Sequence, residues 1–175
     1  MTPTGRKSGL SGARLAVCIV ASSLLMLVGA TAVAATPDRQ QRAVVERLYQ
    51  DFAWEAVLES DTPGLAEQSK DVLRRYFTAR LAGLIAEDAA CAARRREICR
   101  LDFAPLWGSQ DPSAEALTLT SADGDTVRVQ YMVPSTREHI ALSFRVAKSA
   151  DGWRIDDILY PDGSSLAKLL SAPLD

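Results

Sequence analysis

The sequence predicts an α+β protein in which N-terminal helices pack on a curved, cone-like, four-stranded antiparallel sheet, followed by a short C-terminal helix. From about residue 37 to residue 93, apolar side chains recur at the period of a helix. After residue 112 they alternate at a period of two, and turn residues separate the runs. Helices first and a meander of strands afterwards favour a layer of helices on one face of a sheet.

The first predicted helix begins near Pro37 and Asp38, which are residue types typical of a helix N-terminus. The stretch 61–64, Asp-Thr-Pro-Gly, interrupts the helical pattern, and a second helix is predicted from about Ser69. The apolar faces of the two helices comprise Val44, Val45, Leu48, Phe52 and Val57 in the first, and Val72, Leu73, Tyr76, Phe77, Leu81, Leu84 and Ile85 in the second.

The four predicted strands cover about residues 117–119, 127–133, 140–146 and 153–159. A typical hairpin turn, Asp-Gly-Asp at 123–125, joins the first two strands. Residues 134–137 connect the next pair, and Asp-Gly at 151–152 turns the chain into the last strand. A short helix is predicted from about Ser165 to Leu170.

Residues 1–34 are typical of a cleavable signal peptide. Arg6, Lys7 and Arg14 form a basic start, an apolar run follows over residues 15–33, and alanines provide the small residues of a cleavage site. A membrane anchor is the alternative, because the run approaches the ~20 residues that span a bilayer. However, serine, threonine and glycine residues interrupt it, so export followed by cleavage is favoured.

Residues 35–175 are therefore expected to form a single α+β domain in the periplasm, with no membrane span after cleavage. Cys18 raises the alternative of a lipoprotein. That alternative is less favoured, because Val17 precedes the cysteine where a small residue is required, and Cys18 lies early in the apolar run.

The charge of the mature chain argues against nucleic acid as a partner. Without the three basic residues of the signal peptide, 17 of the 20 basic side chains remain against 22 acidic ones, which leaves a net charge of about −5. The same balance gives no general attraction to an anionic membrane surface.

Two cysteines remain in the mature chain, Cys91 and Cys99, and they flank the three consecutive arginines 94–96. An even number of cysteines in an oxidising compartment predicts a disulfide. Eight residues of straight helix separate two Cα atoms by about 12 Å, whereas a disulfide needs about 7 Å or less. The helix that contains Cys91 must therefore end before Cys99, which leaves the arginines on a solvent-facing turn.

Two short motifs resemble those of an uncharacterised exported bacterial family, domain of unknown function 3828. They are Leu-Asp-Phe-Ala-Pro-Leu at 101–106 with Gln-Asp at 110–111, and Trp-Arg-Ile-Asp-Asp-Ile at 153–158. The resemblance covers roughly residues 44–170 and implies a cone fold like that of nuclear transport factor 2 and the cystatins. It implies no catalytic residues.

Strand pairing places a basic cluster on the outer face of the predicted sheet. A connection at 134–137 pairs Tyr131 with Ile140, Val129 with Leu142 and Arg128 with Ser143, and keeps the apolar residues on the core face. If Val146 pairs with Trp153, then Arg145 lies opposite Arg154, and Ser143 lies opposite Asp156. Like charges directly opposite each other destabilise a sheet. The candidate binding residues Arg128, Arg145, Arg154 and Asp156 therefore either contact an acidic partner or form an ordinary solvated face.

The same register turns Asp157 inward, where a buried carboxylate needs hydrogen-bond partners or takes a raised pKa. Within a cone fold, Asp157 beside Tyr131 resembles the acid–tyrosine pair of ketosteroid isomerases. The alternative is that Asp157 caps a backbone amide at the end of the sheet. One Asp and one Tyr without a second acid or a histidine make an incomplete mechanism, so an enzyme is not expected.

No metal site, cofactor motif or hydrolase motif is recognisable in the sequence. The first functional hypothesis is an exported, non-enzymatic protein that binds another protein in the periplasm, either an envelope factor or an immunity protein that neutralises a toxin. The alternative is a carrier that holds a lipid or another small apolar molecule inside the cone. The third hypothesis is the isomerase-type enzyme. The chain is expected to be a monomer or a homodimer.

Overall fold

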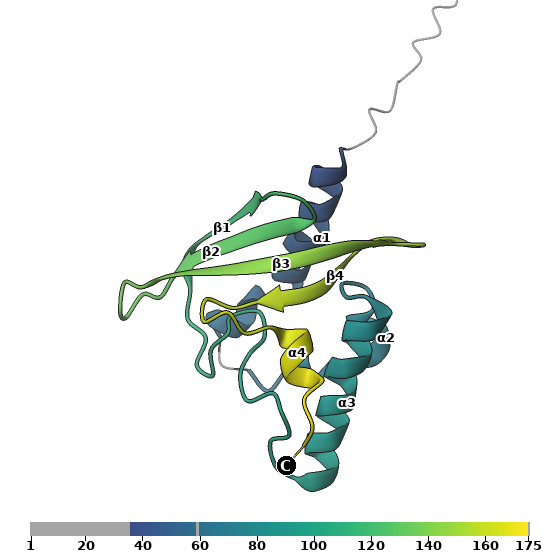
Figure 1. Cartoon of the computed structure of the whole chain (residues 1–175). Coiled ribbons are helices and arrows are strands. Elements are labelled where there is room, and N and C mark those ends of the chain that lie inside the picture. The colour runs from purple at the N-terminus through teal and green to yellow at the C-terminus, as the bar shows by residue number, and fades with distance from the viewer. Residues whose placement is uncertain (1–35, 59, 175) are drawn as a thin grey trace, which may run out of the picture. The chain divides into compact units, whose positions relative to one another are not determined.

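The structure, a computed structural model, describes residues 36–58 and 60–174. The α+β class is confirmed: helices precede an open four-stranded antiparallel sheet, and a short helix follows it (Figure 1). The elements are α1 (Pro37–Phe52), the 3-10 helices η1 (Ala53–Ala56) and η2 (Leu65–Glu67), α2 (Lys70–Leu73), α3 (Ala79–Arg95), β1 (Glu115–Ser121), β2 (Thr126–Met132), β3 (His139–Ser149), β4 (Gly152–Leu159) and α4 (Leu166–Leu170).

The described strands form a simple meander in the order β1-β2-β3-β4. The predicted register of β2 against β3 is confirmed, with Tyr131 opposite Ile140 and Val129 opposite Leu142. Helix α1 crosses the sheet on one side, in contact with β1, β2 and β4 (Figure 1). Helices α3 and α4 pack near β4 at one edge of the sheet.

The predicted register of β3 against β4 was wrong. Val146 lies opposite Ile155, two residues further along than expected, because a tight turn at Ala150 and Asp151 joins the strands. A bulge near Asp156 then shifts the pairing by one more residue. As a result, Arg154 lies opposite Ala147, Arg145 opposite Asp157, and Ser143 opposite Leu159, so the expected pair of opposed arginines does not form.

The predicted helices differ from the structure at two points. Helix α1 ends at Phe52, and Val57 is 67% exposed instead of lying on its apolar face. The second predicted helix is divided into α2 and α3, because the backbone of Tyr76 and Thr78 bonds to Ile155 of β4. Thr78 then caps the start of α3, accepting from the amide of Leu81.

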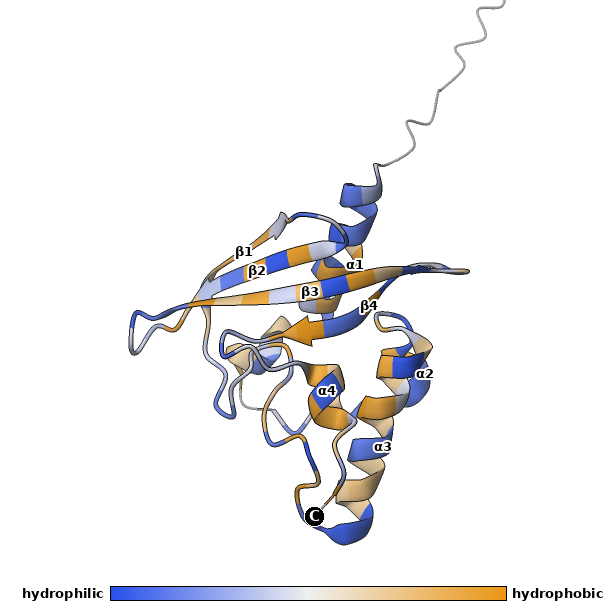
Figure 2. Cartoon of the chain, viewed as in Figure 1, coloured by the Kyte–Doolittle hydropathy of each residue, from blue (hydrophilic) through white to orange (hydrophobic). Residues whose placement is uncertain are grey.

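The interior of the cone is filled by side chains. The rings of Tyr49, Trp107, Tyr131 and Phe144 meet edge to face at centroid distances of 5.3–5.8 Å, a favourable geometry for aromatic pairs. Figure 2 shows apolar residues alternating with polar ones along the strands and along α3, as expected when one face is buried. The fold therefore leaves no hollow of ligand size among these four rings.

The predicted disulfide is confirmed. Cys91 and Cys99 are joined with their Cα atoms 6.2 Å apart. Helix α3 ends at Arg95, and Arg96 adopts a left-handed conformation with φ 58° that turns the chain back. The three arginines are exposed as predicted, but Arg94 and Arg95 belong to the last turn of α3, and only Arg96 lies on the turn that follows.

Within residues 36–58 and 60–174, no helix combines the length and the hydropathy that a membrane crossing requires. The predicted signal peptide, including Cys18, lies outside the described residues and remains a prediction.

Candidate functional site

A plug segment, residues 103–108, closes the wide end of the fold. Three buried tyrosine hydroxyls donate hydrogen bonds to three successive carbonyl oxygens in it: Tyr160 to Pro105, Tyr49 to Leu106 and Tyr131 to Trp107. Burial raises the pKa of each phenol, that of Tyr131 to about 12, so all three remain protonated donors at neutral pH. The plug segment is thereby fixed to α1, to β2 and to the residue that follows β4.

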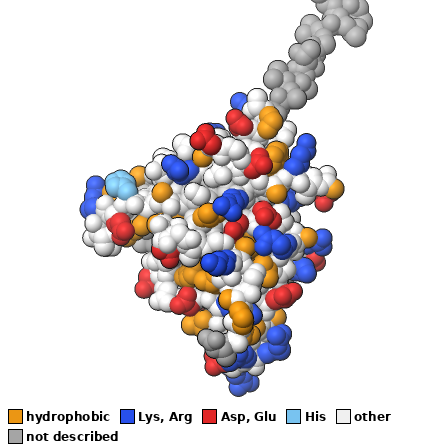
Figure 3. Space-filling model, in the orientation of Figure 1, with side chains coloured by type: hydrophobic (Ala, Val, Ile, Leu, Met, Phe, Trp, Pro, Cys, Tyr) orange, Lys and Arg blue, Asp and Glu red, His pale blue; other side chains and the backbone are white. Residues whose placement is uncertain are grey.

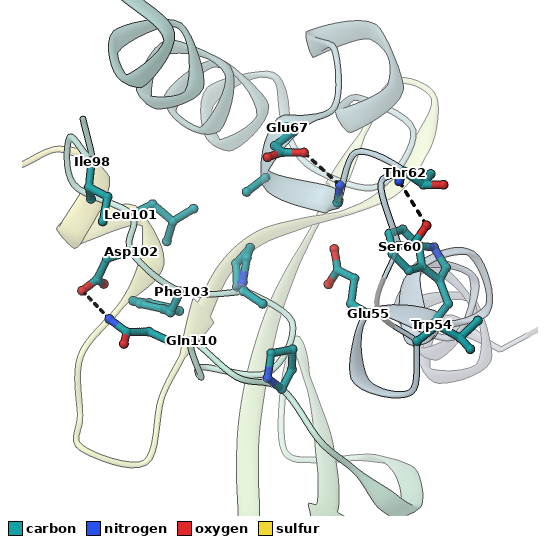
Figure 4. Close-up of a pocket in the computed structure, with 16 residues that line it drawn as sticks. Trp54, Glu55, Ser60, Thr62, Glu67, Ile98, Leu101, Asp102, Phe103 and Gln110 are labelled. Carbon is teal, nitrogen blue, oxygen red and sulfur yellow. Dashed lines mark hydrogen bonds between the residues drawn. The ribbon is translucent and has the colours of Figure 1, made fainter. Parts of the chain in front are cut away.

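A mouth pocket of about 490 Å³ lies beside the plug segment. One wall is formed by residues of the stretch 54–67, around η1 and η2, and the other by residues of the stretch 98–112 (Figure 4). Apolar side chains on the walls include Trp54, Leu101 and Phe103. Leu58 and Ile98 also line the pocket and are 63% and 66% exposed, so each wall presents an aliphatic side chain to solvent.

The local chain geometry brings Glu55 to this pocket. Helix α1 gives way to η1 at Ala53, and the chain then returns along residues 60–65. The Glu55 Oε1 atom accepts a hydrogen bond from the backbone amide of Leu65. A Cβ atom on Gly64 would lie 2.8 Å from that same oxygen, so only glycine lets the backbone approach the carboxylate this closely.

The second carboxylate oxygen of Glu55, Oε2, is buried and makes no hydrogen bond within the described residues. The indole N–H of Trp107 is likewise buried and makes none. Burial raises the pKa of the Glu55 carboxyl; the Leu65 amide and the nearby Trp107 indole counteract this in part, and Glu67 raises the pKa further. In Figure 4 the Glu55 carboxylate points between the two walls. Groups with perturbed pKa values in clefts are candidates for functional sites.

A side pocket of about 460 Å³ adjoins the mouth pocket. The two hollows share Ala66, Glu67 and Leu101 as lining residues. The far wall of the side pocket is the face of α3 that carries Ile85 and the small residues Ala89, Ala92 and Ala93. The two hollows together form a groove between α3 and the plug segment, lined by both polar and apolar side chains, and each hollow is within the size range of small-molecule sites.

The basic cluster predicted on the sheet is only partly brought together. Arg128 and Arg145 are exposed. The Arg154 guanidinium instead donates to the backbone carbonyls of Arg74, Asp151 and Trp153. Asp156 accepts from Thr78 and pairs with Arg80 at 3.1 Å. Of the four predicted residues, Arg154 and Asp156 therefore have defined structural roles.

Asp157 and Tyr131 belong to separate hydrogen-bond networks in the described residues. Asp157 is 8% exposed, and its carboxylate accepts from the Ser165 hydroxyl and from the amides of Ile158 and Ala167. These contacts cap the start of α4, which is the alternative role considered for this residue. Tyr131 donates to the Trp107 carbonyl in the plug segment. Within the described residues, Asp157 and Tyr131 make no hydrogen bond to each other.

Sequence reasoning missed Trp54 and Glu55. It treated residues 53–57 as the end of the first helix, because Val57 continues the apolar pattern of that helix. The available signal was a tryptophan and an acid a few residues before the Asp-Thr-Pro-Gly break at 61–64. That signal shows a chain reversal, but it does not reveal which side chains the reversal buries.

Comparisons with known proteins assign no family. No family model matches the chain, and no curated protein matches it, so the resemblance to domain of unknown function 3828 remains a prediction. Among solved structures, the chain is similar to a phospholipid-binding protein from Ralstonia solanacearum in complex with a phospholipid. The identity is 18% and the TM-score 0.30, over 77% of this chain and 70% of that chain. A similarity this weak says nothing about the ligand of the present protein.

Proposed function

We propose that this protein is an exported, non-enzymatic binding protein of the periplasm that holds a small apolar or amphipathic molecule in the mouth pocket. The observation that carries the proposal is the pocket itself. It joins apolar side chains of two walls, extends into the side pocket, and exposes Leu58 and Ile98 to solvent. Aliphatic side chains exposed beside a hollow are typical of ligand-binding grooves.

The sequence suggested a carrier that holds its ligand inside the cone. The present proposal places the ligand in the mouth pocket instead. The aromatic side chains of the interior already contact one another. The plug segment, held by three tyrosine hydroxyls, provides a rigid floor. A rigid floor favours affinity, because little conformational entropy is lost when a ligand binds.

Export remains part of the proposal. The Cys91–Cys99 disulfide supports an oxidising compartment. It also anchors the wall that carries Ile98 and Leu101, because it ties that wall to the end of α3.

The test is binding of Nile red, a neutral apolar dye, to the purified mature chain. The double variant Leu58→Ser/Ile98→Ser removes apolar surface that is already exposed, so the fold should persist. We expect its affinity for the dye to fall by about tenfold or more, since each buried methylene contributes about 0.8 kcal/mol.

Leu174→Ser is the matched control, because Leu174 is 39% exposed and lies outside the pocket lining. Equal dye affinity in the native chain and both variants would contradict the proposal. Native mass spectrometry of protein purified without detergent adds a second readout, in which a retained small mass should be lost from the double variant but not from the control.

Protein binding through the sheet is the second candidate function. The observation that favours it is the pair of exposed arginines, Arg128 and Arg145, for which no ion pair is found within the described residues. A photo-crosslinking residue at position 128 should then yield one discrete product in the periplasm. The same residue at position 87, exposed on α3, should not. Identical products from both positions would reject a specific sheet partner.

A further inference from the structure

We infer that the mouth pocket selects amphipathic molecules that carry a positive charge, with Glu55, Glu67 and Asp102 as its charged side. This inference rests on the proposed function, since it assigns the chemical class of the molecule that the same pocket holds.

The first observation is the charge of the pocket lining. Glu55, Glu67 and Asp102 all line it, and no Lys, Arg or His does so among the described residues. None of the three takes part in an ion pair within residues 36–58 and 60–174. Their hydrogen bonds come from neutral groups: the amides of Leu65 and Gly64, and the Gln110 side chain. The acidic side of the pocket therefore has no internal cation.

The second observation is the position of Glu55 within this group. Its carboxylate is partly withdrawn from water: Oε1 accepts from the Leu65 amide, and Oε2 is buried, with the Trp107 indole beside the carboxylate. A charge in such surroundings interacts more strongly with an opposite charge than an exposed one does, because the local dielectric constant is lower. A ligand cation seated in the pocket offsets the cost of burying the Glu55 charge. An anionic headgroup at the same place adds repulsion.

The third observation is the separation of acidic and basic surfaces. Figure 3 shows basic side chains gathered at the tip of the molecule where α3 ends, and Arg94, Arg95 and Arg96 at the end of α3 are exposed. None of them lines the mouth pocket. A further acid, Asp111, lines the hollow beside it, which shares Glu55 and Leu58. Among the described residues, the charged side chains that line the pocket and the hollow beside it are therefore all acidic.

The apolar lining favours an organic cation over a metal ion. Within the described residues, no three His, Cys, Asp or Glu side chains come together as metal ligands. The side pocket offers the alanine-rich face of α3 to an apolar chain. A molecule with an ammonium or guanidinium group near Glu55 and a hydrocarbon body between α3 and the plug segment matches both features.

The test is isothermal titration calorimetry of the mature chain with three probes that share a twelve-carbon chain. The probes are dodecylammonium, dodecyl maltoside and dodecyl sulfate, each used below its micelle-forming concentration. We expect dodecylammonium to bind with one-to-one stoichiometry and about tenfold more tightly than the neutral probe, and dodecyl sulfate to bind most weakly.

The variant Glu55→Gln should remove most of the preference for the cation while leaving the affinity for the neutral probe within about twofold of the native value. The control Glu87→Gln makes the same exchange at an exposed site on α3 outside the pocket. It should keep the full preference. Circular dichroism at the probe concentrations used verifies that the chain stays folded.

The outcomes separate the two proposals. If the neutral and cationic probes bind equally well, or if Glu55→Gln and Glu87→Gln lose the preference to the same extent, charge selection is rejected and the mouth pocket remains an apolar site. If neither probe binds and Nile red binding does not depend on Leu58 and Ile98, the proposed function itself fails.

Discussion

Glu55 and Asp157 both carry a carboxylate that is at least partly withdrawn from water, but the two carboxylates differ in how fully the fold satisfies them with hydrogen bonds. At the start of α4, Asp157 accepts from the Ser165 hydroxyl and from two backbone amides. At the mouth pocket, Glu55 Oε1 accepts from the Leu65 amide, and the buried Oε2 atom has no hydrogen bond of good geometry, although the Trp107 indole lies beside the carboxylate. The difference teaches that burial by itself does not mark a functional acid. A carboxylate whose oxygens are all bonded within the fold stabilises the fold, whereas the less fully bonded carboxylate of Glu55 belongs to a pocket lining, where its charge can act on a ligand.

The largest expected effect is at the Asp157 site. Asp157→Ala leaves the buried amides of Ile158 and Ala167 without their acceptor and removes the cap of α4, so we expect a loss of about 3 kcal/mol in the free energy of unfolding. Urea denaturation measures it. Asp156→Ala is the neighbouring control and should cost about 1 kcal/mol or less, because its ion pair with Arg80 is exposed. Equal losses in both variants would overturn the structural role assigned to Asp157.

The disulfide should have the next largest effect. Cys91 and Cys99 are eight residues apart in the sequence, and replacing both by serine opens the loop that their disulfide closes. The chain-entropy model predicts a loss of about 2.5 kcal/mol in the free energy of unfolding. The released wall carries Ile98 and Leu101, so affinity for Nile red should also fall. A single reducing treatment of the native chain should reproduce both changes. Unchanged dye affinity after reduction would show that the wall does not need the disulfide.

Gly64→Ala sharpens the assignment of Glu55. The added Cβ would lie 2.8 Å from Glu55 Oε1, so the carboxylate must shift, which weakens its hydrogen bond to the amide of the buried Leu65. We expect a loss of about 1 kcal/mol in stability together with a weaker preference for the cationic probe. In the background of Glu55→Gln, the same glycine substitution should no longer change that preference. A double-mutant cycle with additive effects on probe binding would refute the coupling.

The smallest expected effect is the pH dependence of stability due to Glu55. Burial raises the pKa of the folded Glu55 carboxyl above that of the unfolded chain. Between the two pKa values the folded state binds more protons, so the free energy of unfolding falls as pH rises through that window. Two titratable groups face this carboxyl: Glu67 of η2, and Tyr49 of α1, whose own pKa is also raised by burial.

Glu55→Gln removes this cost. At about pH 7.5 the variant should be more stable than the native chain, by no more than about 1 kcal/mol, and the gain should shrink toward about pH 4. Denaturation curves of both proteins at several pH values measure the difference. If the stability gain of Glu55→Gln over the native chain is larger at acid pH than at neutral pH, the predicted sign is wrong.

Local patterns were sufficient to predict the central hairpin and the disulfide. In β2 and β3 a strict alternation of apolar residues keeps Val129 and Leu142 on one face, and the connection at 134–137 selects among the registers that do so; the selected register is observed. Between β3 and β4 the same rule failed, because the bulge near Asp156 depends on contacts with Thr78 and Arg80 that lie far away in the sequence. The helix predicted from Ser69 failed for a similar reason, since β4 bonds to Tyr76 and Thr78.

By itself, the sequence determined the order of helices and strands, the faces they bury and the closure of Cys91 with Cys99, because periodicity, turn residues and short loops act locally. The tertiary structure alone decided where a ligand could bind. The mouth pocket joins residues of the stretch 54–67 to residues of the stretch 98–112, which includes the plug segment, and the Glu55 Oε2 atom is buried where these two stretches pack together. Burial and charge at such a site arise from contacts between distant segments, and no local pattern encodes them.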